Sequence, residues 1–139
     1  MFIDKYKNAD GDGYTYDGGY CENEESVYLG ILGFCGCGMP DEAIRYVRDC
    51  LRYIADLQDT VLPVKGRDQR DIAYKRWENA GKMLFVNEGC EYFMYYYLDN
   101  LGFTEHGGSV PGWLSDEGRA VLSDLDILVA RYDAEETEG

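Results

Sequence analysis

Apolar residues recur at helical spacing over much of this 139-residue chain, and the clearest example follows Pro40. A proline followed by two acidic residues suits the first turn of a helix, because no backbone N–H needs a partner there and the helix dipole favours negative charge. The apolar stripe of this segment consists of Ile44, Val47, Leu51, Ile54 and Leu57. Oppositely charged residues four positions apart line its polar side. The pattern predicts an amphipathic helix from residue 40 to about residue 59.

Cap residues and apolar spacing predict four further helices. Asn23 or Ser26 is expected to begin a short helix that ends at the glycines of FCGCG. Residues 67–79 predict a helix with a charged surface, which Gly81 is expected to end. The other two helices belong to residues 87–128.

Residues 87–128 predict a complete unit of helix, hairpin and helix. Asn87 is expected to cap the first helix and Ser115 the second. Short apolar runs on either side of a Gly-Gly-Ser turn predict a small β-hairpin near residues 103–114. The residues expected to face the core are Cys90, Phe93, Tyr97, Leu98 and Leu101 on the first helix and Val121, Leu122, Leu125 and Leu128 on the second. The expected fold class is therefore mainly α, formally α+β, with about five helices and this hairpin.

Length and composition favour one globular domain over residues 1–132. A chain of this size buries roughly two thirds of the surface that it exposes when unfolded, and 45% of its residues are hydrophobic. Residues 1–20 are rich in Gly, Asp and Tyr and are expected to be irregular, with a short strand around Tyr14 to Tyr16. Residues 133–139 are expected to form a flexible acidic tail.

The formal charge of the chain is −14, because 27 acidic residues face 13 basic ones. Neither Lys nor Arg occurs between Lys82 and Arg119. A negative field repels phosphate groups, which argues against direct binding of nucleic acid or of an anionic membrane by this part of the chain. The basic surface of another protein is the partner that this charge favours.

One basic segment runs against this trend. Between Lys65 and Arg76 there are five basic residues and two acidic ones. Binding of nucleic acid through this segment is therefore an alternative, provided that its positive charge outweighs the acidic remainder.

Candidate metal ligands and nucleophiles are few. The segment NADGDG resembles the start of a calcium-binding EF-hand loop, but Gly19 stands where the closing bidentate Glu is required. Cys35 and Cys37 are two positions apart and lack the second cysteine pair of a zinc site. The one histidine, His106, lies in an expected turn, and no motif around it or around Cys90 indicates an activated nucleophile.

No catalytic residue, metal or cofactor is therefore expected, and the main expectation is a protein that is not an enzyme. A small metal- or thiol-dependent enzyme or ligand-binding domain that uses Cys35, Cys37, Cys90 or His106 stays an alternative. No apolar run approaches the roughly 18 residues of a membrane span, and the opening MFIDKYKNAD lacks the apolar core of a signal peptide. The five cysteines are accordingly expected to be reduced thiols in a cytoplasmic protein.

Residues 87–128 also resemble the later part of a winged helix. Leu114, Ser115, Glu117 and Gly118 match the leucine, serine or threonine, acid and glycine of the helix start that follows the wing, with the acid and the glycine adjacent here. The resemblance implies a winged-helix-like C-terminal half. It does not imply DNA binding, because the helix EYFMYYYLDN at the recognition position has two acids and no base, and the wing has Glu105.

The short acidic chain, its tyrosine-rich helix and the phrase TEHGGSVPGWL are similar to small proteins of bacteriophages and prophages. This resemblance implies a class in which inhibitors of host defence, including anti-CRISPR and anti-restriction proteins, are common. Such inhibitors often place a carboxylate surface in the basic nucleic-acid channel of their target.

These features lead to the hypothesis of a non-enzymatic acidic protein that binds a host protein. Its concrete form is a phage inhibitor and nucleic-acid mimic that blocks the basic nucleic-acid channel of a defence nuclease. Tyrosines are expected to supply affinity, and carboxylates to speed encounter and set specificity. The residues expected at the interface are Glu88, Glu91, Tyr92, Tyr95, Tyr96, Asp99, Glu105, Trp113, Asp116 and Glu117. The identity of the partner, the oligomeric state and the role of the tyrosine face, as interface or as core, stay open at this point.

Overall fold

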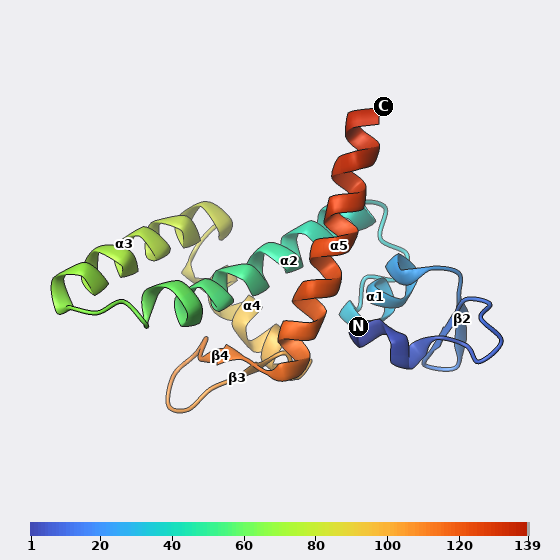
Figure 1. The fold of residues 1–139 in the computed structure, drawn as a ribbon, viewed down its shortest axis with the longest axis horizontal. Helices are drawn as coiled ribbons and strands as arrows, with labels where there is room; N and C mark the ends of the chain where they lie inside the picture. Colours follow the sequence, from blue (N-terminus) through green and yellow to red (C-terminus); the bar gives the residue numbers. More distant parts are fainter. Residues whose placement is uncertain (139) are drawn as a thin grey trace. The chain divides into compact units, whose positions relative to one another are not determined.

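Five α-helices and two small antiparallel hairpins make up the computed structural model of the chain, which describes residues 1–138 (Figure 1). The expected class, mainly α with a small β contribution, is confirmed. Contacts divide the chain into two compact units, unit 1 (Met1–Arg48 with Ala120–Gly139) and unit 2 (Asp49–Arg119). The expectation of one domain over residues 1–132 stays a prediction.

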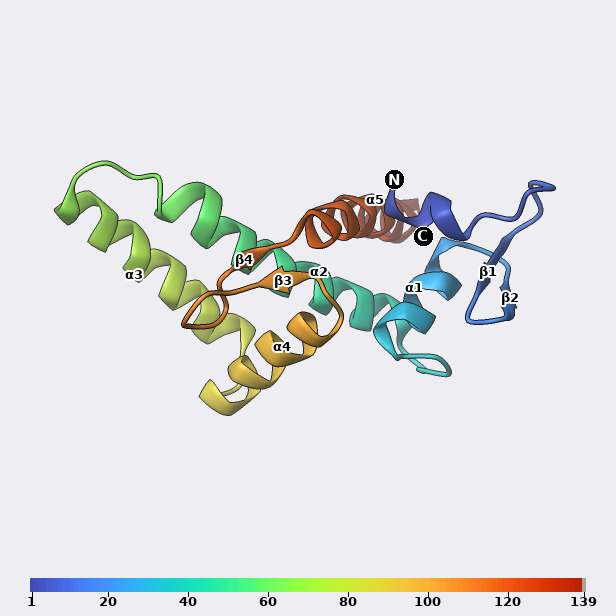
Figure 2. The same ribbon diagram turned by 90° about the horizontal axis from the view of Figure 1, so that it is seen from below.

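Unit 1 begins with a 3₁₀ turn, η1 (Phe2–Tyr6), and a hairpin of β1 (Tyr14–Tyr16) and β2 (Gly19–Cys21) (Figure 2). The strand β1 was expected, and residues 8–13 form turns and irregular structure as predicted, whereas η1 and β2 lie where irregular structure was predicted. The hairpin forms because Asp17 and Gly18 take φ values of 51° and 79°. A two-residue turn between twisted strands requires this left-handed conformation.

The first helix of unit 1, α1 (Glu24–Leu32), begins at Asn23. The Asn23 side chain accepts the backbone N–H of Ser26 at 2.9 Å, which confirms one of the two expected caps. The helix ends at Gly33, where φ is 83°. The buried hydrophobic residues of unit 1 include Ile3, Val27, Tyr28, Leu32, Ile44, Val47, Val121, Leu122, Leu125, Leu128 and Val129. The four core positions expected on the last helix are therefore confirmed.

Two long helices, α2 (Pro40–Asp56) and α5 (Asp116–Glu138), contribute to both units. The helix α5 covers residues 133–138, where the sequence predicted a flexible acidic tail. Its carboxylates have a cationic partner on α2: the Arg45 guanidinium lies 2.7 Å from Asp133 and 3.3 Å from Glu136. Positive charge near the C-terminal end of a helix offsets both these acids and the helix dipole, and the sequence pattern did not show this contact.

In unit 2, α2 gives way to a π-helical turn, η2 (Leu57–Val61), slightly earlier than predicted. The helix α3 (Arg67–Leu84) then runs back along the end of α2, as Figure 1 shows, and passes through Gly81. The prediction that Gly81 ends this helix was wrong. A Cβ atom at Gly81 would lie 2.3 Å from the hydroxyl oxygen of Tyr53, so the glycine permits a close helix contact.

The helix α4 (Glu88–Asn100) begins at Asn87, whose side chain accepts the backbone N–H of Cys90 at 2.9 Å, as expected. Its buried residues are Met94, Tyr95 and Leu98. Leu98 is buried as expected, but Cys90 is exposed and Phe93 is 72% exposed, so these two expected core positions were wrong. The helix is apolar on nearly every side, and apolar spacing therefore does not select the buried face.

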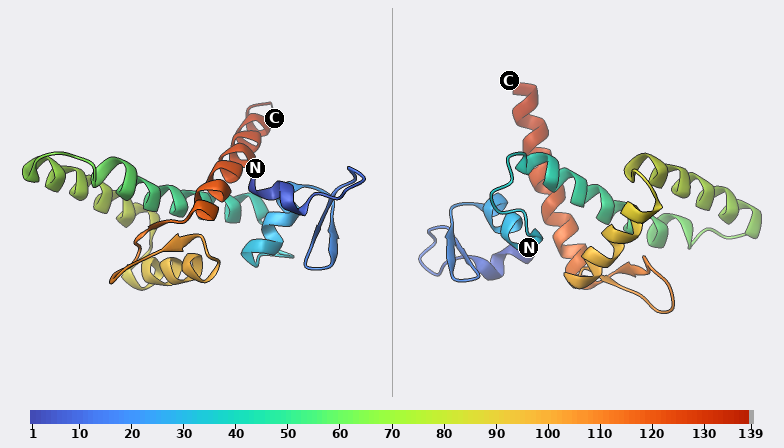
Figure 3. Two further views of the ribbon diagram at one scale, coloured as in Figure 1. Left: turned by 60° about the horizontal axis from the view of Figure 1, so that its bottom comes forward. Right: turned by 180° about the vertical axis from the view of Figure 1, so that it is seen from behind.

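The hairpin of β3 (Thr104–Glu105) and β4 (Trp113–Leu114) lies beside α4 (Figure 3). The expected Ser115 cap is confirmed, because its Oγ atom accepts the backbone N–H of Gly118 at 3.0 Å. The order of helix, hairpin and helix in residues 87–128 is thus as expected, while the likeness to a winged helix stays a prediction. Within residues 1–138, every helix falls short of the length or the apolarity that a membrane span requires.

Candidate functional site

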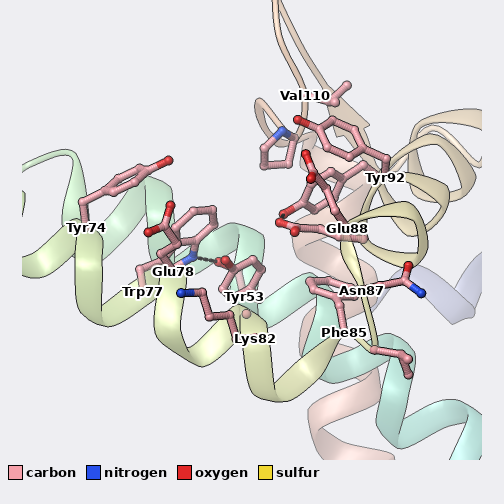
Figure 4. A pocket seen from close by; sticks show the side chains of 15 residues that line it. Tyr53, Tyr74, Trp77, Glu78, Lys82, Phe85, Asn87, Glu88, Tyr92 and Val110 are labelled. Carbon is pink, nitrogen blue, oxygen red and sulfur yellow. Dashed lines mark hydrogen bonds between the residues drawn. The ribbon is translucent and has the colours of Figure 1, made fainter.

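A pocket of about 550 Å³ opens in unit 2 between α3 and α4, with the end of α2 at its base (Figure 4). A hydrogen bond joins α3 to α2 at the base of the pocket: the Trp77 indole N–H donates to the backbone oxygen of Tyr53 at 2.6 Å. The two rings are stacked, with centroids 4.1 Å apart and planes 7° from parallel. Buried stacked rings of this kind form a stiff surface, because few rotamers fit the space around them.

Aromatic side chains line the pocket from three helices and the connection before α4. Phe85 and Tyr95 are buried and meet edge to face, with centroids 5.9 Å apart. Tyr74 on α3 and Tyr92 on α4 are 43% and 42% exposed, and Figure 4 shows them on opposite sides of the pocket. The pocket therefore has a fixed aromatic floor and two half-exposed tyrosines at its rim.

Carboxylates give the pocket a negative charge. Glu78 comes from α3, while Glu88 and Glu91 come from the first turn of α4. Among the pocket residues that the structure describes, Lys82 is the one with a positive charge. At neutral pH the lining thus carries two more negative charges than positive ones.

The Glu91 carboxylate also orders the floor of the pocket, because it accepts the Tyr95 hydroxyl at 2.5 Å. Burial raises the pKa of the Tyr95 hydroxyl well above its ordinary value, and the bond to Glu91 raises it further. Burial likewise raises the pKa of Tyr53, with smaller contributions from the charges of Glu91 and other nearby groups. Both hydroxyls stay protonated at neutral pH, so neither supplies a phenolate nucleophile or base.

The structure gathers only part of the predicted interface at this pocket. Glu88, Glu91, Tyr92 and Tyr95 line it. Tyr95, however, is only 3% exposed and acts as a floor residue rather than as a surface anchor.

The other predicted interface residues lie outside the pocket lining. Tyr96 is exposed on α4, and Asp99 lies 3.7 Å from the His106 ring nitrogen Nε2. Glu105 accepts the Trp113 indole N–H at 3.1 Å across the β3–β4 pair. Asp116 and Glu117 are exposed in the first turn of α5.

Sequence reasoning missed the contribution of α2 and α3 to this pocket. Tyr74, Trp77, Glu78, Gly81 and Lys82 recur at the spacing of one helix face, which is the signal that was present. Tyr53 has no such signal, because it lies beside the apolar stripe of α2 and its role depends on which helix packs against it.

The residues of the enzyme alternative show no assembled metal site. Within residues 1–138, no group of three or more His, Cys, Asp or Glu side chains has the arrangement that could hold a metal ion. Cys35 and Cys90 are exposed, and the Cys37 sulfur accepts the backbone N–H of Met39 at 3.4 Å.

The two remaining sequence features have simple surroundings. In the NADGDG segment, the Asn8 side chain donates to the backbone oxygen of Asp12 at 2.8 Å, and the Asp10 carboxylate accepts the Asp12 N–H at 3.0 Å. These bonds stabilise a polar turn. The basic residues between Lys65 and Arg76 are exposed at the start of α3 and just before it.

The fold and the pocket together define a mainly helical acidic protein with an aromatic cavity rimmed by carboxylates. Comparisons of the chain with protein-family models, with curated proteins and with solved structures found no match. The resemblances to a winged helix and to small phage proteins stay predictions.

Proposed function

We propose that this molecule is a non-enzymatic acidic protein that binds the basic surface of a partner protein through unit 2. The proposal rests on one observation above all: the segment without Lys or Arg carries exposed aromatic side chains. Phe93 and Tyr96, three positions apart on α4, are 72% and 54% exposed. Tyr92 is four positions before Tyr96, so these rings share one side of the helix.

Carboxylates border this aromatic patch, which consists of Tyr92, Phe93 and Tyr96. Glu88 precedes Tyr92 by one helical turn, and Asp99 follows Tyr96 by three positions. Aromatic residues with an acidic border match the anatomy of an interface with a basic protein, in which rings supply affinity and charges guide encounter.

The concrete form of the proposal is a phage inhibitor that occupies the basic nucleic-acid channel of a host defence nuclease. The net charge of −14 favours such a channel over other protein surfaces. Carboxylates on a rigid helical surface can take the place of phosphates there, and the protein needs no catalytic group to act by obstruction.

The test is a titration of purified CRISPR and restriction nucleases with the full chain at rising NaCl concentrations, with and without competing DNA. We expect one of these nucleases to bind, DNA to displace the protein, and the affinity to fall by at least about tenfold between 50 and 200 mM salt. Affinity that is independent of salt, or binding that DNA leaves unchanged, would contradict channel occupation.

A pair of variants distinguishes binding through the aromatic patch from nonspecific binding through exposed apolar side chains. Phe93→Ser combined with Tyr96→Ser should weaken nuclease binding by at least about tenfold, because buried aromatic anchors dominate interface energies. Ile72→Ser removes an exposed apolar side chain elsewhere in unit 2, on α3, and should leave binding unchanged.

If the protein alone shifts DNA at low salt, and Lys75→Gln with Arg76→Gln abolishes the shift, the nucleic-acid alternative replaces the proposal.

A further inference from the structure

The pocket between α3 and α4 presents its aromatic rings and its carboxylates to the same space. Tyr74 and Glu78 come from consecutive turns of α3, and Glu88 and Tyr92 from consecutive turns of α4. Figure 4 shows the α3 pair on one side of the opening and the α4 pair on the other. A group that enters the pocket therefore meets a ring and a carboxylate from each of two helices.

This combination selects an organic cation. The face of an aromatic ring carries a partial negative charge and attracts a cation within about 6 Å of its centre. Carboxylates at the rim add charge-assisted hydrogen bonds. An anionic ligand would be repelled by Glu78, Glu88 and Glu91. A neutral apolar ligand would displace water from these carboxylates and would offer Glu78 and Glu88 neither a positive charge nor a hydrogen-bond donor in return.

The shape of the site favours a planar guanidinium over a compact ammonium. A guanidinium stacks on a ring face and donates in its own plane toward carboxylates on either side, whereas an ammonium is a strongly hydrated point charge. The volume of about 550 Å³ lies within the range of sites that enclose small ligands, so a long side chain enters with its apolar stem against the rings.

We propose that this pocket binds an arginine side chain that the partner protein inserts between α3 and α4. The inference rests on the proposed function, because a basic protein surface is the source of the arginine. The aromatic patch of Tyr92, Phe93 and Tyr96 lies on the helix that forms one wall of the pocket, so a single partner surface covers both.

The pocket already contains a cation that a ligand must compete with. Lys82 lies four positions after Glu78 on α3 and lines the same cavity. Its ammonium lowers the negative potential that an arginine meets. Removal of the Lys82 charge should therefore strengthen binding of an arginine. The site can thus be tested by a variant that gains affinity as well as by variants that lose it.

The experiment uses the full chain and the peptide acetyl-Gly-Ser-Arg-Ser-Gly-amide. The chain has two tryptophans, and in the Trp113→Phe variant the remaining one, Trp77, reports on the pocket by its fluorescence. We expect a saturable change with the arginine peptide, and binding at least about tenfold weaker when citrulline, which has the same shape without the charge, replaces arginine. A lysine peptide should bind at least about threefold more weakly than the arginine peptide.

Matched charge variants distinguish the pocket from the general acidity of the chain. Glu88 and Asp116 are the first residues of α4 and α5, so Glu88→Gln and Asp116→Asn remove equivalent charges at equivalent helix positions. Glu88→Gln should weaken the arginine peptide by about threefold to tenfold, and Asp116→Asn by less than twofold. Lys82→Met should tighten binding by a similar factor, while Lys75→Met, outside the pocket on the same helix, should not.

Three outcomes would overturn the inference. The first is that the citrulline peptide binds as tightly as the arginine peptide, and the second is that Glu88→Gln and Asp116→Asn weaken binding equally. The third is that ethylguanidinium binds and the arginine peptide does not, which would indicate a site for a small-molecule cation. The peptide titration contains no nuclease. Its failure therefore removes the arginine site and leaves the proposed function standing, whereas failure of the nuclease titration alone removes the nuclease and leaves the arginine site.

Discussion

Asp124 is the most deeply buried carboxylate among the described residues, at 3% exposure. Its Oδ2 atom accepts the backbone N–H of Ile3 at 3.0 Å and the Tyr28 hydroxyl at 2.5 Å. Within residues 1–138, its Oδ1 atom has no hydrogen-bond partner. A buried charge with few donors depends strongly on each of them, so this residue ties η1 and α1 to α5 within unit 1.

The Tyr28→Phe variant tests this dependence. It leaves the ring in place, removes one of two donors to the carboxylate, and should lower the free energy of unfolding by about 1–3 kcal/mol, measured by urea denaturation. Tyr96→Phe removes an exposed hydroxyl and should change stability by less than about 0.5 kcal/mol. Equal effects of the two variants would show that the Tyr28 bond contributes nothing specific.

At the scale of elements, the start of α5 is fixed by two small residues. The Ser115 hydroxyl donates to the backbone oxygen of Gly102 at 2.7 Å while it caps the helix through Gly118. A Cβ atom on Gly118 would lie 2.0 Å from the backbone oxygen of Phe103. The serine and glycine that resemble a winged-helix motif thus have a local physical reason: they let the helix start close against the chain that leaves α4.

Gly118→Ala should therefore destabilise the protein by about 2–3 kcal/mol, because the added methyl group meets backbone that cannot move aside cheaply. Ser115→Ala should cost about 1 kcal/mol through loss of the cap. Gly108→Ala is the control, since a Cβ atom there meets open space. Thermal unfolding of the three variants provides the comparison, and a Gly118→Ala protein as stable as the control would contradict the close contact.

At the scale of the whole molecule, the 13 tyrosines divide by their surroundings. Burial raises the pKa of Tyr97 to about 12. Burial and neighbouring carboxylates raise the pKa of Tyr28 and Tyr95 still further above the ordinary value. Each of these tyrosines has a higher pKa in the folded protein than in the unfolded chain, where the pKa is about 10. Its contribution to the free energy of unfolding is therefore fully present below about pH 10 and decreases as the pH rises above that value.

Alkaline titration followed by absorbance at 295 nm should show this division. Tyr28, Tyr95 and Tyr97 should ionise only at a pH well above that at which an unfolded tyrosine ionises, and their ionisation should accompany loss of helical circular dichroism. In concentrated urea all tyrosines should ionise near pH 10. A folded protein whose tyrosines all ionise in one step near pH 10 would contradict the burial of Tyr28, Tyr95 and Tyr97.

Several elements were predictable because their signals are local. The caps Asn23, Asn87 and Ser115 satisfy backbone N–H groups within three residues of themselves, whatever the rest of the chain does. The hairpin of β1 and β2 had a local signal too, in the Asp17-Gly18 turn, which was not used. The core face of α5 was predictable because its apolar residues form one narrow stripe.

The sequence by itself determined the helical class, the caps and the distribution of charge, because each depends on residues near one another in the chain. Only the tertiary structure decided which side of α4 is buried, why α3 passes through Gly81, and that Tyr53 and Trp77 form the floor of an acidic pocket. Each of these three features depends on which faces of neighbouring helices pack against one another. The energy of such contacts comes from shape and burial between segments, which a pattern along one segment does not contain.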